Sequence, residues 1–317
     1  MSDSSLYPHG ITFHHFHDEK HYKGQGSISQ KEFDSILNYI GVHCILSPEE
    51  WLQRLEKKTL NKEDVCLTFD DGLRCQIDIA LPILEHYNLK AYWFVYSNVF
   101  QGKLDNTETY RQFRARYFDN IDDFYALFFD IFFKSKFSVK ADDILNPNSI
   151  KKYRQRFPFY SENDAKFRLI RNEMLERADY EKMMESLIQT KGLNKIELSK
   201  NLWMSDDDLR YLNRKGHMIG LHSYSHPTAL DRLSYEDQYQ EYQRNYSHLT
   251  QVCGKPPISM SHPCDSYNND TLEILRSFGI QCGFRANLDH DQEQRKADPN
   301  KLELPRQDHS SILSTLD

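Results

Sequence analysis

The chain of 317 residues lacks a long apolar run, and no stretch approaches the roughly 18 consecutive apolar residues of a membrane-spanning helix. Its start, Met-Ser-Asp-Ser-Ser-Leu-Tyr, has neither the basic residues nor the apolar core of a signal peptide. The six cysteines are scattered, without CxxC pairs or the spacing of a disulfide framework. These absences predict a cytoplasmic protein with free thiols and no membrane span.

An excess of positive charge is also absent. The net charge of −7 argues against a dedicated nucleic-acid-binding protein, which usually carries a basic face. The basic cluster from Lys151 to Arg156 lies among acidic residues in the sequence, so we interpret it as a solvated face. The length suits one large α/β domain, or a domain of about 200–250 residues with an insertion.

Three apolar segments end in residues capable of chemistry. Residues 10–13, 65–69 and 218–221 each have the pattern of a short strand, and helical patterns such as 206–215, 234–252 and 271–278 lie between or after them. Strands that alternate with helices predict a parallel sheet, in which functional residues gather at the carboxyl ends of the strands. The residues that follow the three segments are His14, His15, His17, Asp70, Asp71, His222 and His226.

Residues 101–200 interrupt this alternation. They are aromatic and charged, and their pattern is helical throughout. About a hundred residues are too many for a loop in a compact domain. We therefore predict a main domain formed by residues 1–100 and 201–317, with a helical insertion at 101–200 that forms a lid or a dimer surface beside the site.

The Asp pair and the His pair are suited to a metal site. A turn at Gly72 would let the carboxylates of Asp70 and Asp71 reach one pocket. His222 and His226 are four residues apart and can chelate one ion, and an Asp with two His leaves positions open for water and substrate. Each motif alone has an ordinary explanation, as a turn or as packed histidines. Both, however, follow strands of the same predicted sheet.

These motifs resemble those of a known family. Thr68-Phe-Asp-Asp-Gly72 and His222-Ser-Tyr-Ser-His226 resemble the TFDDG and H-[ST]-x-x-H motifs of the polysaccharide deacetylases, also called the NodB-homology fold or carbohydrate esterase family 4. The resemblance covers residues 10–100 and 200–308, and it implies a distorted (β/α) barrel of the α/β class. It further implies that Asp70 is the catalytic base and that Asp71, His222 and His226 hold a divalent metal, by default Zn²⁺.

A third motif is only partly kept. Residues 261–268, Ser-His-Pro-Cys-Asp-Ser-Tyr-Asn, resemble the family pattern Arg-x-Pro-Tyr-Gly-x-Tyr-Asn, in which Pro263 and Tyr267 belong to the matching positions. Ser261 replaces the arginine that steadies the base in the family. Asp265 replaces the glycine of the turn, and Asp tolerates a left-handed backbone better than most residues.

Two residues are expected to complete the substrate-binding side of the site. The resemblance places the backbone N–H of Cys264 where the family has an oxyanion donor. Arg306, in Leu304-Pro-Arg-Gln-Asp308, is a candidate to replace the missing arginine. The alternative for Arg306 is an ordinary structural ion pair.

The general acid is the least defined residue. The family often uses a histidine in a late Leu-x-x-His motif, which has no convincing copy here, although His309 is present. Residues 13–18 instead resemble the Tyr-His-x-x-x-Asp opening of the branch whose motifs are circularly permuted, where this histidine protonates the leaving amine. We therefore predict His14 as the acid, with His15, His17 and His309 as alternatives.

The combined prediction is a metal-dependent sugar N-deacetylase that acts on a sugar precursor or saccharide, in surface-polysaccharide biosynthesis. One alternative is another metal-dependent C–N hydrolase, for example a deformylase of an N-formyl sugar. Another is an inactive sugar-binding member, which Ser261 and Asp265 favour and the intact metal and base residues oppose. The expected partner is the N-acetylated substrate, and the oligomeric state is left open.

Overall fold

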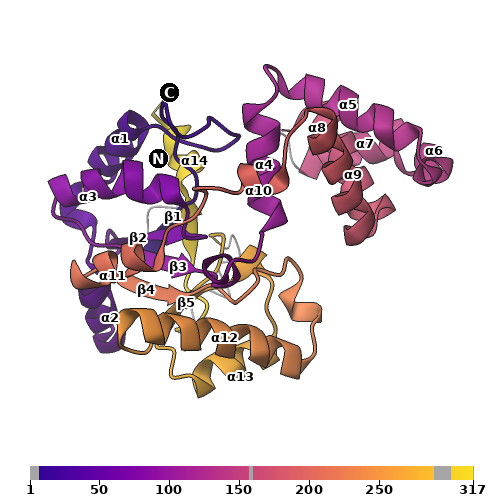
Figure 1. Ribbon diagram of the computed structural model, residues 1–317. Coiled ribbons are helices and arrows are strands. Elements are labelled where there is room, and N and C mark those ends of the chain that lie inside the picture. Colours follow the sequence, from indigo (N-terminus) through magenta and orange to yellow (C-terminus); the bar gives the residue numbers. More distant parts are fainter. Residues whose placement is uncertain (1–6, 157–159, 289–300, 317) are drawn as a thin grey trace. The chain divides into compact units, whose positions relative to one another are not determined.

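The computed structural model describes residues 7–156, 160–288 and 301–316 (Figure 1). The chain divides into two compact units. Unit 1 comprises residues 1–103 and 201–317, and unit 2 comprises residues 104–200. No helix among the described residues is both long enough and apolar enough to cross a membrane. All six cysteines are free thiols.

Unit 1 is built on a parallel sheet, which has seven strands in the described part of the chain. The order across the sheet is β6-β5-β4-β3-β2-β1-β7. Most strand residues are buried, as expected for a parallel sheet covered on both faces. The strands are β1 (His9–Phe13), β2 (Val65–Asp70), β3 (Tyr92–Val95), β4 (Met218–Leu221), β5 (Ser259–Ser261), β6 (Cys282–Phe284) and β7 (Arg306–Asp308).

The two edges of the sheet approach each other at residues 304–306. Leu304 forms a parallel bridge with Phe284 of β6, and its backbone N–H donates to the carbonyl of Gly283 at 2.8 Å. The next residue, Pro305, accepts a hydrogen bond from the N–H of Gly10 on β1 at 3.0 Å. One short segment is therefore bonded to both edges. This confirms the prediction of a distorted (β/α) barrel of the NodB-homology type.

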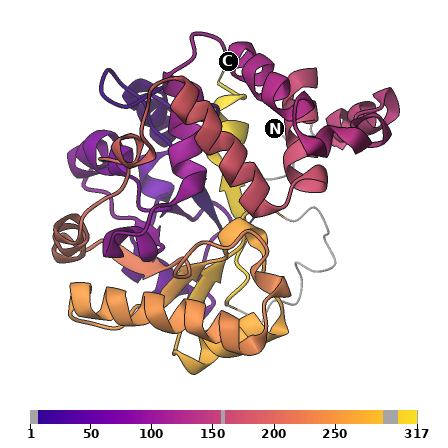
Figure 2. The same cartoon turned by 45° about the vertical axis from the view of Figure 1, so that its right-hand side comes forward.

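The helices of unit 1 begin where side chains cap them. Ser205 and Asp208 form a capping box at the start of α11, and Ser29 and Glu32 do the same for α1. Helices α12 and α13 lie side by side in both views (Figures 1 and 2). The helices are α1 (Gln30–Ile40), α2 (Pro48–Lys57), α3 (Leu81–His86), α11 (Asp206–Arg214), α12 (Tyr235–Cys253), α13 (Asn269–Ser277) and α14 (His309–Leu313).

Unit 2 is helical, as the sequence pattern predicts, and no strand occurs in its described residues. It has a core of its own, in which Phe113, Phe124, Phe128 and Phe167 are fully buried. The aromatic load of residues 101–200 therefore serves mainly to build this core. The helices are α4 (Asn106–Arg116), α5 (Ile121–Phe133), α6 (Ala141–Ile144), α7 (Pro147–Arg156), α8 (Glu162–Leu169), α9 (Arg177–Thr190) and α10 (Lys195–Leu198).

Candidate active site

The two adjacent carboxylates lie at the carboxyl end of β2. Asp70 is the last residue of this strand, and Asp71 and Gly72 follow with φ angles of 75° and 65°. Positive φ is unusual for a residue other than glycine, so the turn at Asp71 is a strained feature. The turn brings both carboxylates near His222, and the negative charge of each favours the protonated form of this imidazole. Both aspartates are buried.

Asp71, His222 and His226 converge on one point. The Oδ1 atom of Asp71 lies 3.5 Å from the Nε2 atom of each histidine. One ligand atom from each residue lies within 4.8 Å of the others. Oδ1 of Asp71 is buried and has no hydrogen-bond partner within the described residues. A carboxylate oxygen and two imidazole nitrogens around one point form the donor set of a catalytic metal site, so these residues fit a divalent metal.

The orientation of His222 is fixed by its neighbours. Its Nδ1–H donates to the carbonyl of Ser261 on β5 at 2.9 Å, which leaves the Nε2 lone pair free to bind a metal. Its backbone N–H donates to Oδ1 of Asn245 on α12 at 3.0 Å. Asn245 in turn donates to the carbonyl of Val95 on β3 at 2.9 Å. The ligand is therefore held from two neighbouring strands and one helix.

A second residue of α12 organises the loop between the two histidines. Glu241 accepts hydrogen bonds from the backbone N–H groups of Tyr224 and Ser225, at 3.0 and 2.8 Å, and from the Ser225 hydroxyl at 2.7 Å. The loop needs this support because Ser223 and His226 both have positive φ angles. The sequence did not reveal Glu241 or Asn245 as site residues, since both lie in a helix rich in Glu, Gln and Tyr.

Asp70 is held apart from this metal-ligand set. Nη1 and Nη2 of Arg306 donate to its two oxygens, both at 2.8 Å, and the Ser261 hydroxyl donates at 3.2 Å. Burial alone would raise the pKa of Asp70, but the charge of Arg306 and the nearby histidines lower it overall. Asp70 is therefore an ionised carboxylate that its neighbours hold in one orientation. Ser261 replaces the arginine of the family motif and contacts the same carboxylate.

His14 lies beside this carboxylate. Its Nε2 atom is 3.6 Å from Oδ2 of Asp70. Burial lowers the pKa of His14, and the charges of Asp70 and Asp71 oppose this effect. The His15 ring is stacked against His14, with ring centroids 6.2 Å apart. The structure thus brings His14 within reach of a proton on Asp70.

Two of the three other candidate acids, His309 and His17, have ring nitrogens engaged elsewhere. Nδ1 and Nε2 of His309 lie 3.1 and 3.2 Å from the carbonyls of Thr12 and Gly26. Nδ1 of His17 lies 3.0 Å from the Ser27 hydroxyl. In the described part of the chain, neither histidine forms an ion pair with Asp70.

The turn of the third motif has the left-handed backbone that favours glycine, although this chain has Asp265 where the family pattern has glycine. Cys264 and Asp265 have φ angles of 52° and 57° in the short 3₁₀ turn Pro263–Asp265. The Asp265 carboxylate accepts a hydrogen bond from the N–H of Ala286 at 2.9 Å. Burial, followed by the charges of the two site carboxylates, raises the pKa of the Cys264 thiol to about 11. Cys264 therefore lies within electrostatic range of the site as a neutral thiol.

Tyr267 connects this motif to the segment that closes the barrel. Its hydroxyl donates to Glu303 at 2.9 Å, and its ring stacks on His262 with centroids 3.9 Å apart. His262 donates in turn to the carbonyl of Leu302 at 2.8 Å. The contacts of Tyr267 therefore fix the loop, and Pro263 is buried at the start of the turn.

The comparisons with known proteins agree with this geometry. The sequence model of the polysaccharide deacetylase family matches residues 57–116 and 183–283, just over half of the chain. No curated protein sequence matches it.

Solved structures of low sequence identity share the fold. The Streptococcus pyogenes deacetylase PplD in complex with acetate is 16% identical, with a TM-score of 0.56 and 98% of each chain covered. IcaB from Ammonifex degensii is 12% identical, with a TM-score of 0.52 and coverage of 98% of this chain and 96% of that one. The deacetylase domain of BpsB from Bordetella bronchiseptica is 10% identical, with a TM-score of 0.50 and 97% of each chain covered. Because the family model matches just over half of the chain, the chain belongs to the polysaccharide deacetylase family.

Proposed function

We propose that the chain is a metal-dependent sugar N-deacetylase, which removes an acetyl group from the nitrogen of a sugar precursor or saccharide used in surface-polysaccharide assembly. One observation carries the proposal. A set of metal ligands, Asp71 with His222 and His226, lies beside a carboxylate, Asp70, that a buried arginine holds separately. A module that only binds sugar needs no such division between ligands and base.

Asp71, His222 and His226 would hold the ion, and Zn²⁺ is the default for two imidazoles and one carboxylate. When bound, such an ion supplies Lewis acidity toward the acyl carbonyl and the attacking water. Asp70 is outside this set, because both of its oxygens accept hydrogen bonds from Arg306.

The remaining steps belong to side chains and backbone. Asp70 takes the proton of the attacking water, because its lowered pKa keeps it ionised at neutral pH. The backbone N–H of Cys264 donates to the carbonyl oxygen as negative charge develops there. His14, 3.6 Å from Asp70, receives the proton directly or through one water and passes it to the departing nitrogen. The products are acetate and a free amino sugar.

Two rival functions differ from a deacetylase: one enzyme would remove a formyl group, and the other protein would bind sugar without catalysis. A deformylase would use the same residues, so only the released acid distinguishes it. Ser261 in place of the family arginine favours an inactive protein. That argument is weakened by Arg306, which reaches Asp70 from β7 and supplies the missing guanidinium contact.

The test is the release of acid from a panel of N-acetylated and N-formylated nucleotide sugars and oligosaccharides, with metal-loaded protein. We expect acetate, and a loss of at least about 100-fold for His14→Gln, the usual contribution of a general acid. His15→Gln is the matched control and should keep most of the activity. Formate as the main product would identify a deformylase. Tight metal binding without release of either acid would indicate a sugar-binding protein.

A further inference from the structure

Unit 2 contains three arginines, stacked on the rings of Phe167 and Tyr160, that the proposed function does not use. Arg114 lies on α4, Arg168 on α8 and Arg171 in the turn that follows α8. The Cζ atoms of Arg114 and Arg171 are 5.4 and 5.8 Å from the centroid of Phe167. The Cζ atom of Arg168 lies 3.9 Å above the ring of Tyr160. Cation–π contacts therefore hold all three guanidinium groups.

No carboxylate in the described part of the chain is paired with these charges. Within the described residues, no ion pair joins Arg114, Arg168 or Arg171 to a carboxylate, and the Nε atoms of Arg114 and Arg168 are buried without a hydrogen-bond partner. The acidic residue one turn before Arg168 is Asp164, whose carboxylate accepts hydrogen bonds from the Tyr125 hydroxyl and from the N–H and hydroxyl of Ser161. A buried Nε–H donor without an acceptor is costly, so the guanidinium groups of Arg114 and Arg168 favour an anionic acceptor.

The three charges are close enough to affect one another. Burial lowers the pKa of Arg171, and the charges of Arg168 and Arg114 contribute to this effect. All three guanidinium groups also act on Tyr180, where they oppose the rise in pKa that burial causes. The Tyr180 ring also contacts the Phe167 ring, with centroids 6.2 Å apart, so its hydroxyl can serve as an additional hydrogen-bond donor near Arg114 and Arg171.

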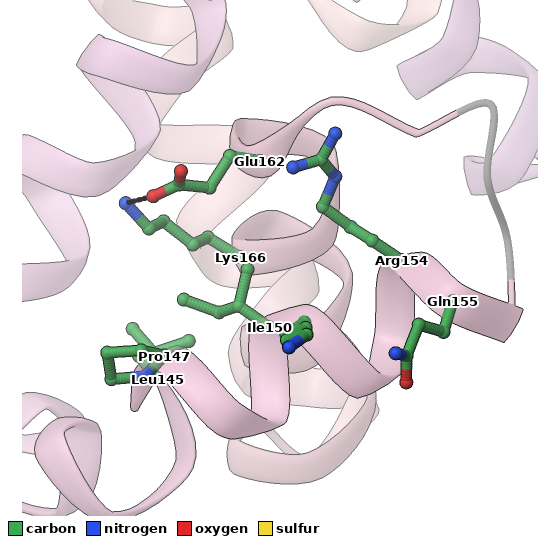
Figure 3. Close-up of a pocket in the computed structure, with 8 residues that line it drawn as sticks. Leu145, Pro147, Ile150, Arg154, Gln155, Glu162 and Lys166 are labelled. Atoms are coloured by element: carbon green, nitrogen blue, oxygen red, sulfur yellow. Dashed lines mark ion pairs between the residues drawn. The ribbon is translucent and has the colours of Figure 1, made fainter.

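The open pocket in unit 2 is a different feature (Figure 3). It has a volume of about 550 Å³, and the Lys166 ammonium on its wall is paired with Glu162 at 2.6 Å. Lys166 and Arg168 are two residues apart, so they point roughly 200° apart around α8. The pocket therefore opens on another face of this helix. It is lined by Leu145, Pro147, Ile150, Lys151, Arg154, Gln155, Glu162 and Lys166.

We propose that Arg114, Arg168 and Arg171 form a binding site for a phosphate group, carried by a sugar phosphate or present as free phosphate. A phosphate monoester has a charge of about −1.5 to −2 and three strong acceptor oxygens, which match three guanidinium groups. A single carboxylate would leave more of the positive charge uncompensated. The site is independent of the metal centre, and the proposal does not depend on deacetylation.

The experiment is a calorimetric titration of the full chain with inorganic phosphate and, separately, with N-acetylglucosamine 1-phosphate. A chelator removes metal beforehand, so that phosphate cannot bind at the metal centre, and the ionic strength is kept constant with chloride. We expect one bound phosphate per chain. Arg114→Gln, Arg168→Gln and Arg171→Gln should each weaken binding at least about tenfold. Tighter binding of the sugar phosphate would identify a sugar ester as the ligand, and equal affinities would identify free phosphate.

Arg177→Gln is the matched control, because Arg177 is an exposed arginine of the same unit, paired with Glu181 at 2.9 Å. It should bind phosphate as the wild type does. The three Arg→Lys variants keep the charge and lose the fork, so they should fold and bind with intermediate affinity. Two results would overturn the proposal. One is a phosphate titration that releases no more heat than a chloride titration. The other is an equal phosphate affinity for the wild type, the Arg→Gln variants and the Arg→Lys variants.

Discussion

Arg306 and Asp70 form a bidentate ion pair across the closing edge of the barrel, with both N···O distances at 2.8 Å and a separation of 236 positions in sequence. The strand between them is β1, where Gly10 lies opposite Arg306. A Cβ atom at position 10 would lie 3.0 Å from Cγ of Arg306. The absence of a side chain at Gly10 therefore makes room for the arginine to pass over β1 and reach Asp70.

Removal of the arginine should damage both stability and catalysis. Arg306→Gln leaves the buried Asp70 carboxylate without its counter-charge, which costs about 3–5 kcal/mol of unfolding free energy. Acetate release should fall by about 100-fold or more, because the base loses its orientation. Urea denaturation and an acetate assay measure the two effects. The double variant Asp70→Asn/Arg306→Gln should be more stable than Arg306→Gln alone, and equal or lower stability would refute the pairing.

A smaller change on β1 tests the same contact. Gly10→Ala adds a methyl group against the Arg306 side chain, and overpacking of this kind costs about 1–3 kcal/mol. We expect slower acetate release with unchanged metal affinity, because the metal ligands lie in the loops that follow β2 and β4. A variant with wild-type kinetics would show that Arg306 does not depend on the space at Gly10.

The support of the histidine loop predicts the behaviour of α12 variants. Glu241→Ala removes the acceptor of three hydrogen bonds from Tyr224 and Ser225 and should weaken metal binding by about 10–100-fold. Glu236→Ala on the same helix changes an exposed glutamate and is the matched control. Metal titration in a competing chelator measures both. Equal affinities would mean that the loop keeps its conformation without Glu241.

Stability in acid should depend on His217, a buried histidine outside the site. Its Nδ1 atom accepts the N–H of Ala91 at 3.1 Å, and burial together with the charge of Lys90 lowers its pKa to about 4. The unfolded chain has a histidine pKa of about 6.5 and binds a proton first, so stability falls as the pH drops from about 6.5 to 4. The loss reaches about 3 kcal/mol, at 1.36 kcal/mol per pKa unit.

His217→Asn keeps a hydrogen-bond acceptor but does not titrate in this range. Urea denaturation at several pH values should therefore give a shallower decline for this variant than for the wild type. Identical slopes would show that His217 contributes no pH dependence.

The sequence was sufficient for the parts of the fold that carry strong local patterns. The apolar run before His222 ends where β4 ends, and the run before Asp70 ends one residue before the end of β2. The barrel predicted from the family motifs is confirmed. Strand β5 escaped prediction because Ser259–Ser261 has three residues, two of them polar. Helices α1 and α2 also went unpredicted, although Ser29 and Ser47 cap them.

Long-range contacts in the candidate site could not be derived in the same way. The partnership of Arg306 with Asp70 depends on the closure of the sheet, and that of Glu241 with the histidine loop depends on how α12 packs. A sequence pattern describes neither of these arrangements. Arg306 became a candidate only because the resemblance pointed to an arginine that Ser261 had replaced.

The most direct test of the central claim compares Asp70→Asn with Asp71→Asn in two measurements, metal affinity and acetate release. Asp70 is assigned as the base and Asp71 as a ligand. The account therefore predicts that Asp70→Asn binds metal as the wild type does and releases almost no acetate, whereas Asp71→Asn loses both properties. Undiminished metal binding by Asp71→Asn, or wild-type acetate release by Asp70→Asn, would contradict it.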